Sequence, residues 1–376
     1  VESKHEKGVI YTASNDGRLH LTRDNGTTWK NVTPKGLPET LINSIEISPH
    51  DRGTVYLATT RYKFNDYTPG LYKSTNYGKS WKLINTGIPK GAYTKVVRED
   101  EERKDLLFAG TVTGMYVSWN GGLNWSALQL NLPITPITDI AISHGNIVVA
   151  TQGRSFWILD DLNILRQYEG PSNEGKLYTP APTYIANWSS SFNSNESKGI
   201  ELLRGVNPAN GMVLYYSLPP LEKETELTMT ILDEQDNIVN TFSSTGNKNY
   251  VSYEGNPPKK PVLPKNIGLN RFVWNMRYPL LPGIPKVYIE GSYSGHQAIP
   301  GTYKLILTYD KKSFETKAII QANPFYNLSK AQYQVYHTFM SSAATSYREM
   351  TDMTNQLNEM NKKLKSLLSE MDPKEH

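Results

Sequence analysis

The sequence lacks several features that would place it quickly in a class of protein. None of its 376 residues is cysteine, which excludes disulfides and thiolate metal sites. No apolar run approaches the roughly 20 residues that a membrane-spanning helix needs. Lys and Arg total 40 against 36 Asp and Glu, without a basic tract, so nucleic acid is not expected as a partner. The absence of cysteine is compatible with the cytosol and equally with a bacterial periplasm or cell surface.

The start of the chain also lacks two common features. It has neither an initiator Met nor a signal peptide, and it opens in a polar run over residues 1–7. We therefore expect the sequence to be a processed or cut part of a longer protein.

What the sequence does contain is a short repeat of the form Ser/Thr-x-Asp/Asn-x-Gly-x-x-Trp. Its copies end at Trp29, Trp81 and Trp125, which are 52 and 44 residues apart. The shared polar and glycine positions are Asp24 and Gly26, Asn76 and Gly78, and Asn120 and Gly122. Such periods are typical of the four-stranded blades of a β-propeller.

The repeat is predicted to be structural. The Asp or Asn side chain can accept hydrogen bonds from the amides of its own turn, glycine allows a positive φ, and tryptophan covers the hairpin. Asn76 and Asn120 replace the Asp found at position 24, and an amide cannot act as a general base. The repeat therefore predicts a fold and not a catalytic carboxylate.

Strand patterns recur in step with this repeat and indicate about four blade-like units that end near Asp161. The first unit lacks its innermost strand. An open arc of blades would expose apolar faces. We therefore expect the ring to be completed by N-terminal blades, supplied by a separate chain or by another part of a precursor.

The rest of the chain divides by composition. Residues 1–168 are predicted to form the blades, and 169–210, rich in Ser, Asn, Gly and Pro, a linker or wrapping loop. Alternating short strands predict an immunoglobulin-like β-sandwich over 211–323. The segment 324–376 is predicted to be a long helix. The fold class is therefore mainly β: a partial β-propeller, a β-sandwich and a C-terminal α-helix.

The predicted helix carries an apolar seam. Tyr336, Ala343, Met350, Leu357 and Leu364 recur every seven residues, and Phe339, Met353, Met360 and Leu367 follow most of them by three. This is the a/d pattern of a coiled coil. Because the seam is rich in Met and Thr, we favour packing of the helix onto the rest of the protein over a self-assembling coiled coil. A hairpin broken near residues 341–346 is a further alternative.

Several runs resemble a known family. Residues 61–69, 106–111 and 272–279, and above all the run from Gly153 to Asp161 (Gly-Arg-Ser-Phe-Trp-Ile-Leu-Asp-Asp), are similar to large secreted bacterial proteins with sortilin-like propellers. The repeats of these propellers are called Asp boxes or BNR repeats, and they often bring the label of glycosyl hydrolase. The resemblance covers nearly the whole chain as the C-terminal part of such a protein. It implies a secreted, periplasmic or cell-surface bacterial location.

Candidate binding residues come from the connections between the second and third strands of the blades. In propellers these connections lie beside the central channel, opposite the Asp-box turns. Arg18, Tyr62, Tyr67 and Arg154 could therefore surround one surface that suits carboxylates, sugars or peptides. Alternatively, Arg154 pairs with Asp160 or Asp161 and the tyrosines are packing residues.

Two functions follow from these observations. The first is a non-catalytic binding or scaffold protein, with a sortilin-like propeller that recognises a protein or glycan ligand. The alternative is a sialidase- or xyloglucanase-like glycoside hydrolase, which needs two carboxylates about 5–9.5 Å apart. The candidate carboxylates are Asp16, Asp66, Asp139, Asp160 and Asp161, none of them in a diagnostic motif. We favour binding, and we predict no catalytic residue, metal or cofactor in this chain.

Overall fold

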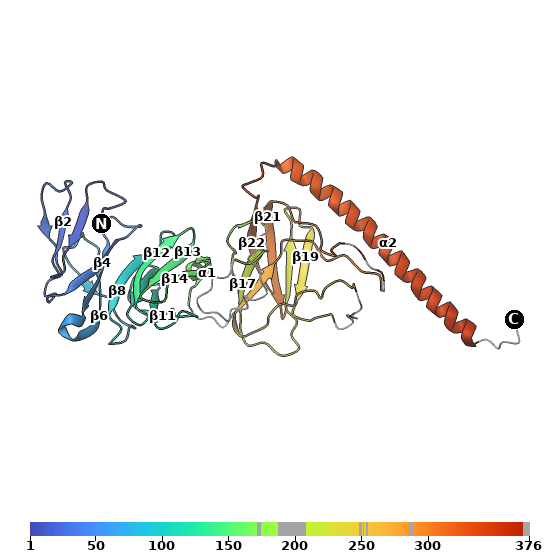
Figure 1. Ribbon diagram of the computed structural model, residues 1–376, viewed down its shortest axis with the longest axis horizontal. Helices are drawn as coiled ribbons and strands as arrows, with labels where there is room; N and C mark the ends of the chain where they lie inside the picture. Colours follow the sequence, from blue (N-terminus) through green and yellow to red (C-terminus); the bar gives the residue numbers. More distant parts are fainter. Residues whose placement is uncertain are drawn as a thin grey trace. The chain divides into compact units, whose positions relative to one another are not determined.

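A computed structural model describes residues 1–170, 174–186, 208–247, 250, 252, 255–285, 287, 289 and 291–370. Most of the predicted linker over 169–210 lies outside these residues. The described chain separates into two compact units, one ending at Arg166 and the other beginning at Gln167. We call them the blade unit and the sandwich unit (Figure 1).

The blade unit consists of four antiparallel sheets in which each strand pairs with the next along the chain. The first sheet contains β1 (Ile10–Ala13), β2 (Leu19–Thr22) and β3 (Lys30–Asn31). The second contains β4 (Leu41–Ile47), β5 (Val55–Arg61), β6 (Asp66–Ser74) and β7 (Lys82–Leu83), with a short 3-10 helix η1 (Tyr62–Phe64) between β5 and β6. The third contains β8 (Thr94–Glu99), β9 (Leu107–Thr111), β10 (Met115–Ser118) and β11 (Ser126–Ala127). The fourth contains β12 (Ile137–Ser143), β13 (Asn146–Thr151) and β14 (Phe156–Leu159), and the helix α1 (Asn163–Gln167) follows.

Neighbouring sheets pack face to face as the blades of a partial propeller. Strand β5 shows how, because side chains alternate between the two faces of a strand. Val55 and Leu57 lie in the core shared with the first sheet, whereas Tyr56 and Ala58 lie in the core shared with the third. A further core between the third and fourth sheets includes Phe108. The predicted mainly β fold is therefore confirmed, and completion of the ring by further blades stays a prediction.

The three Trp-ended turns have nearly identical hydrogen bonds. Asp24 Oδ1 accepts from the Thr28 amide at 2.8 Å, and Asn76 and Asn120 accept from the amides four residues on, at 2.9 and 3.0 Å. The glycines of the turns have φ values of 81–91°. The Trp81 and Trp125 indoles donate to the carbonyls of Val32 and Ile84, so each ties its turn to the preceding blade. An amide thus replaces the carboxylate in the turn without loss of these bonds.

The sandwich unit contains two sheets. The smaller is ordered β15 (Lys176–Leu177), β17 (Met212–Leu218), β20 (Gly268–Trp274). The larger is ordered β16 (Thr183–Tyr184), β22 (Lys312–Gln321), β21 (Gly301–Tyr309), β18 (Thr228–Leu232), β19 (Ile238–Ser243). Buried and partly exposed residues alternate along β17 and β21, and the buried ones from both sheets form one core. Trp274 is fully buried there against Tyr303, as expected from its place on a strand.

The helix α2 (Lys330–Glu370) is unbroken, which rules out the hairpin alternative (Figure 1). Ser329 and Gln332 form the N-terminal capping box, with the Ser329 amide donating to the Gln332 side chain at 2.8 Å. The helix packs on its own unit mainly through small and polar residues on the side opposite the seam. Thr351 is fully buried, Ser341 contacts His296, and Asn355 reaches the Gly283 carbonyl.

His296 lies at the centre of this helix contact. Its ring stacks on Tyr278 with centroids 4.1 Å apart, and its Nε2 lies 3.2 Å from Nδ1 of His337 on α2. Burial, and then the nearby His337, Arg348 and Arg277, lower the pKa of His296 to about 4. The pKa of this histidine in the unfolded chain is near 6.5, so between about pH 6.5 and 4 the unfolded chain binds a proton that the folded protein does not. The docked helix is therefore most stable above pH 6.5, and its stability falls as the pH falls towards 4.

We therefore expect acid to undock α2. Because the chain has no cysteine, a donor–acceptor dye pair can be placed on cysteines introduced at Ser292 and Ser346. Energy transfer should fall between about pH 6.5 and 4 in this protein, and should stay high in a His296→Phe variant, which cannot be protonated. Equal pH profiles for the two proteins would contradict this role for His296.

No helix in the described part of the chain is both long enough and apolar enough to cross a membrane.

Candidate functional site

Three tyrosines, two of them exposed and one partly buried, form a cluster on the connections of the second and third blades. Tyr62 lies in η1, Tyr67 in β6, and Tyr93 immediately before β8. The Tyr62 and Tyr93 rings stack with centroids 5.5 Å apart, and Tyr67 lies 6.1 Å from Tyr93. Tyr62 and Tyr67 are 41 % and 43 % exposed. We call these three residues the tyrosine platform, since aromatic rings of this kind offer flat apolar surface together with polar hydroxyls.

The turn that carries Tyr62 is held in place by local interactions. Arg61 Nε lies 3.1 Å from Asp66 Oδ2, and its guanidinium lies over the Phe64 ring. Asn65 adopts a left-handed conformation, with φ 55°, that ends η1. Hydrogen bonds from Thr68, and then the Arg61 charge, lower the pKa of Asp66. Asp66 is therefore an ionised partner that fixes this turn.

A hollow of about 200 Å³ lies beside Tyr62. It is lined by residues of the β1–β2 turn, the start of β4 and the β5–β6 connection, namely Asn15, Asp16, Glu39, Leu41, Thr60, Arg61, Tyr62, Lys63 and Phe64. Two of them, Thr60 and Arg61, carry buried polar atoms (Oγ1 and Nη1) that have no hydrogen-bond partner among the described residues. Unsatisfied buried polar atoms are rare in native proteins, and a bound ligand is one way to satisfy them.

The four sequence-predicted binding residues do not form one cluster. Tyr62 and Tyr67 meet through Tyr93. Arg18 does not line the hollow, but its Nε lies 3.3 Å from Oδ2 of Asp16, which does. Arg154 pairs with neither Asp160 nor Asp161 within the described chain, and its carbonyl accepts from the Trp157 indole at 2.8 Å.

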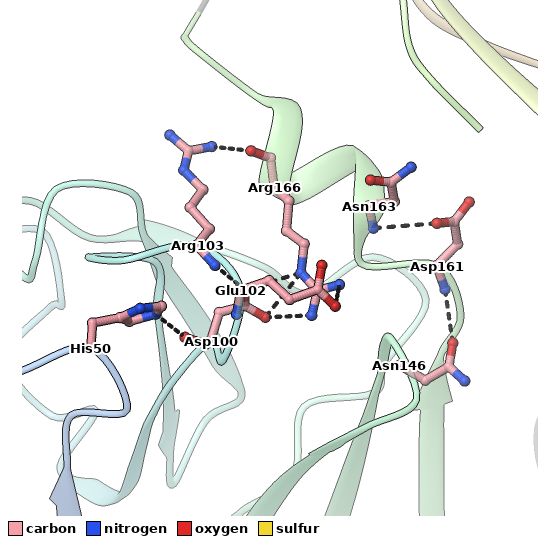
Figure 2. Close-up of polar contacts among 8 residues, drawn as sticks. All are labelled: His50, Asp100, Glu102, Arg103, Asn146, Asp161, Asn163 and Arg166. Carbon is pink, nitrogen blue, oxygen red and sulfur yellow. Dashed lines mark hydrogen bonds and ion pairs between the residues drawn. The ribbon is translucent and has the colours of Figure 1, made fainter. Parts of the chain in front are cut away.

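A second group of polar residues has a structural role. Asp100, with a fully buried side chain, accepts from Nη2 and Nε of Arg166 at 2.8 and 3.0 Å (Figure 2). The same carboxylate accepts from the amides of Glu102 and Arg103, and His50 Nε2 lies 2.7 Å from the Asp100 carbonyl oxygen. This cluster joins the second and third sheets to α1.

An ionic cluster also spans three blades. Arg98 on β8 donates to Asp139 Oδ1 at 2.8 Å and to the Ile140 carbonyl on β12, and to Ser44 on β4. Glu46 on β4 lies 3.7 Å from the same guanidinium. Burial raises the pKa of Glu46 to about 7, and Arg98 acts in the opposite direction. The net effect on the Glu46 pKa is upward, because the lost hydration of its carboxylate outweighs the attraction of a guanidinium that also serves several other acceptors.

No group of three or more His, Cys, Asp or Glu side chains in the described residues could hold a metal ion. Of the candidate carboxylates, Asp16, Asp66 and Asp139 each pair with an arginine. Burial raises the pKa of Asp161, whose carboxylate accepts from the Asn163 amide.

Sequence reasoning missed several residues of these sites. Tyr93 precedes a strand in a segment without a motif, and its neighbours in the platform lie 26 and 31 positions earlier in the chain. Arg61 and Glu46 occupy ordinary strand positions, and only the pairing of the blades shows their partners. Glu46 and Arg98 could have been found as charged residues within the first strand of successive blades, since they lie on β4 and β8.

Neither a protein-family model nor a curated protein sequence matches the chain. Among solved structures, it is similar to YCF48 bound to D1 peptide, with 19% identity and a TM-score of 0.32 over 40% of this chain and 47% of that one. It is similar to the GH74 xyloglucanase from Xanthomonas campestris, with 17% identity and a TM-score of 0.34 over 46% and 30%. It is also similar to YCF48 from Cyanidioschyzon merolae, with 15% identity and a TM-score of 0.33 over 59% and 66%. The chain spans less than half of the length of the first two structures.

Proposed function

We propose that this protein is a non-catalytic binding or scaffold protein, sortilin-like in its propeller, that recognises a protein or glycan ligand at the surface or in the periplasm of a bacterium. The tyrosine platform carries this proposal. Its rings contact one another, Tyr62 stacked on Tyr93 and Tyr67 tilted against it. Such clustered aromatic rings bind a flat apolar face, such as that of a sugar ring or an aromatic side chain, at a low cost in conformational entropy.

The hollow beside the platform adds specificity. The buried Nη1 donor of Arg61 suits an acceptor such as a carboxylate or a hydroxyl oxygen. Lys63 and Asp16, from different connections, line the same hollow and offer charges of both signs. A ligand with a flat face and polar groups at one edge therefore fits the site better than a purely apolar one.

An array of glycans and peptides tests the proposal. We expect the full chain to retain a subset of ligands without releasing products, and a Tyr62→Ala/Tyr67→Ala variant to lose them. The Phe156→Ala variant is the matched control, because Phe156 on β14 is 74 % exposed but lies outside the platform. Retention that is unaffected by the double substitution would contradict the proposal.

The alternative, a glycoside hydrolase, is favoured by one observation. Glycosidases use a general acid whose pKa lies near the working pH, and burial raises the pKa of Glu46 to about 7. If a polysaccharide is cleaved and Glu46→Gln abolishes turnover while binding persists, this alternative replaces the binding proposal.

A further inference from the structure

A groove of about 1210 Å³ lies along α2 in the sandwich unit. One wall is the helix face that carries Asn355, Asn358, Lys362 and Lys365, which follow one another at intervals of three and four and therefore lie in line. The other wall consists of described residues of the β19–β20 connection and of the proline-rich run 279–285. From Asn355 to Lys365 the helix rises about 15 Å, so the groove is long enough for an extended ligand.

Lysines make this groove positively charged. Lys259 and Lys260 lie on the loop wall, and Lys362 and Lys365 on the helix wall. Glu359 is the single acidic residue among the described lining residues, and it pairs with Lys362 at 2.7 Å. The other three lysines form no ion pair within the described part of the chain. This excess of positive charge attracts an anionic ligand.

The two lysines of the loop wall are held over aromatic rings. The Lys259 ammonium lies 5.2 Å from the centroid of the Tyr250 ring, and the Lys260 ammonium lies 5.4 Å from that of Phe242. Partial burial lowers the pKa of Lys260. An ammonium that has lost part of its hydration, with no carboxylate paired to it, gains more from a bound anion than a fully hydrated one does. We therefore expect Lys260 to contribute strongly to anion binding.

The walls of the groove do not suit a peptide or a nucleic acid. Peptides are bound by a sheet edge, an apolar groove, an aromatic-lined groove or a cluster of arginines. This groove has walls of helix and loop, none of its described lining residues is an arginine, and Tyr250 is the single aromatic residue among them. One ring also offers too little surface to stack successive bases of a nucleic acid.

The uncharged lining residues favour a sugar. Asn358 and Asn361 on α2 are exposed, and each amide both donates and accepts hydrogen bonds, as a sugar hydroxyl does. Proline rings on the loop wall, among them Pro257 and Pro282, add apolar surface for the face of a sugar ring.

We propose that this groove binds a linear acidic oligosaccharide. Lys259, Lys260 and Lys365 neutralise its carboxylate or sulfate groups, and Asn358 and Asn361 hydrogen-bond its hydroxyls. These residues belong to the sandwich unit, whereas the tyrosine platform belongs to the blade unit. The inference therefore does not depend on the function proposed for the platform.

Isothermal titration of the full chain tests the proposal with two acidic probes, oligogalacturonate and a sulfated dextran oligosaccharide. We expect at least one of them to bind. Its uncharged counterpart, the methyl ester or the unsulfated dextran, should bind at least about tenfold more weakly, because it offers the lysines no charge. Polyglutamate of similar length is the peptide probe and should also bind more weakly than the acidic sugar.

Two variants locate the binding. Lys260→Gln/Lys365→Gln removes one lysine from each wall and should raise the dissociation constant about tenfold or more. The matched control, Lys312→Gln/Lys317→Gln, removes two exposed lysines of β22 in the same unit but outside the groove, and should leave the constant unchanged. Circular dichroism shows whether each variant is folded.

The proposal is overturned if neither acidic probe binds, if the uncharged counterparts bind as well, or if polyglutamate binds more tightly. Equal losses of affinity in the two lysine variants would also overturn it. So would acidic-sugar binding that is lost in Tyr62→Ala/Tyr67→Ala and kept in Lys260→Gln/Lys365→Gln, which would assign that binding to the platform. Because the platform variant is tested against its own array ligands, failure here would leave the binding proposal unaffected.

Discussion

Replacing Arg166 by Met is expected to lower the free energy of unfolding of the blade unit by about 3–5 kcal/mol. The substitution leaves the Asp100 carboxylate, which is fully buried, without its cation. It also removes the side-chain bonds of Arg166 to the third blade, whereas the bonds that Arg103 and Trp119 donate to the carbonyls of α1 remain. A buried charge that loses its partner retains the cost of its lost hydration without the compensating attraction.

The comparison variant is Glu102→Gln, which removes the other carboxylate bound to Arg166. Glu102 is 69 % exposed, so its loss should cost at most about 1 kcal/mol. Adding Asp100→Asn to Arg166→Met removes the stranded charge and should recover part of the stability. Denaturant titrations followed by tryptophan fluorescence measure all three. An Arg166→Met variant that is as stable as Glu102→Gln would show that the Asp100–Arg166 ion pair does not stabilise the blade unit.

The second large effect concerns the dependence of stability on pH. Burial raises the pKa of Glu46 from 4.5 to about 7. The folded blade unit therefore binds a proton that the unfolded chain releases, and Glu46 contributes stability below about pH 4.5 that is lost as the pH rises through 7. Because one pKa unit corresponds to about 1.4 kcal/mol, the loss is up to about 3 kcal/mol.

A Glu46→Gln variant isolates this contribution, because glutamine has similar shape and does not titrate. The difference in unfolding free energy between the two proteins, measured from pH 4.5 to 8, should shift in favour of the variant as the pH rises. A difference that stays constant across this range would mean that Glu46 titrates normally, and it would weaken the glycosidase alternative as well.

The fold was predictable because local patterns repeat. The glycine and Trp spacing of the Trp-ended turns predicted the blades, and the alternation along strands such as β17 predicted the sandwich. Prediction was weaker for features that depend on contacts between distant parts of the chain, such as the docking of α2. The heptad seam correctly predicted a long helix. The face through which the helix docks was not predicted, because the surface around His296 receives small and polar residues rather than the apolar ones that the pattern picks out.

The candidate site was predictable in part. Tyr62 and Tyr67 were identified from their place between two strands of one blade. Their link, Tyr93, belongs to the next blade, and no local signal connects the two. Likewise, Arg61 Nη1 is buried without a hydrogen-bond partner among the described residues, at a hollow lined by the β1–β2 turn, the start of β4 and the β5–β6 connection, which come from two blades. Such contacts between blades follow from the curvature of the whole array, which the sequence of one blade does not contain.

The central claim is that the tyrosine platform is a binding surface, and the dissociation constant of the strongest array ligand tests it most directly. Isothermal titration should show that Tyr62→Ala and Tyr93→Leu each raise this constant about tenfold or more, as expected for aromatic anchors. Phe156→Ala should leave it unchanged, with unfolding temperatures equal in all variants. Affinities for Tyr62→Ala and Tyr93→Leu equal to that of the unsubstituted protein would contradict the account.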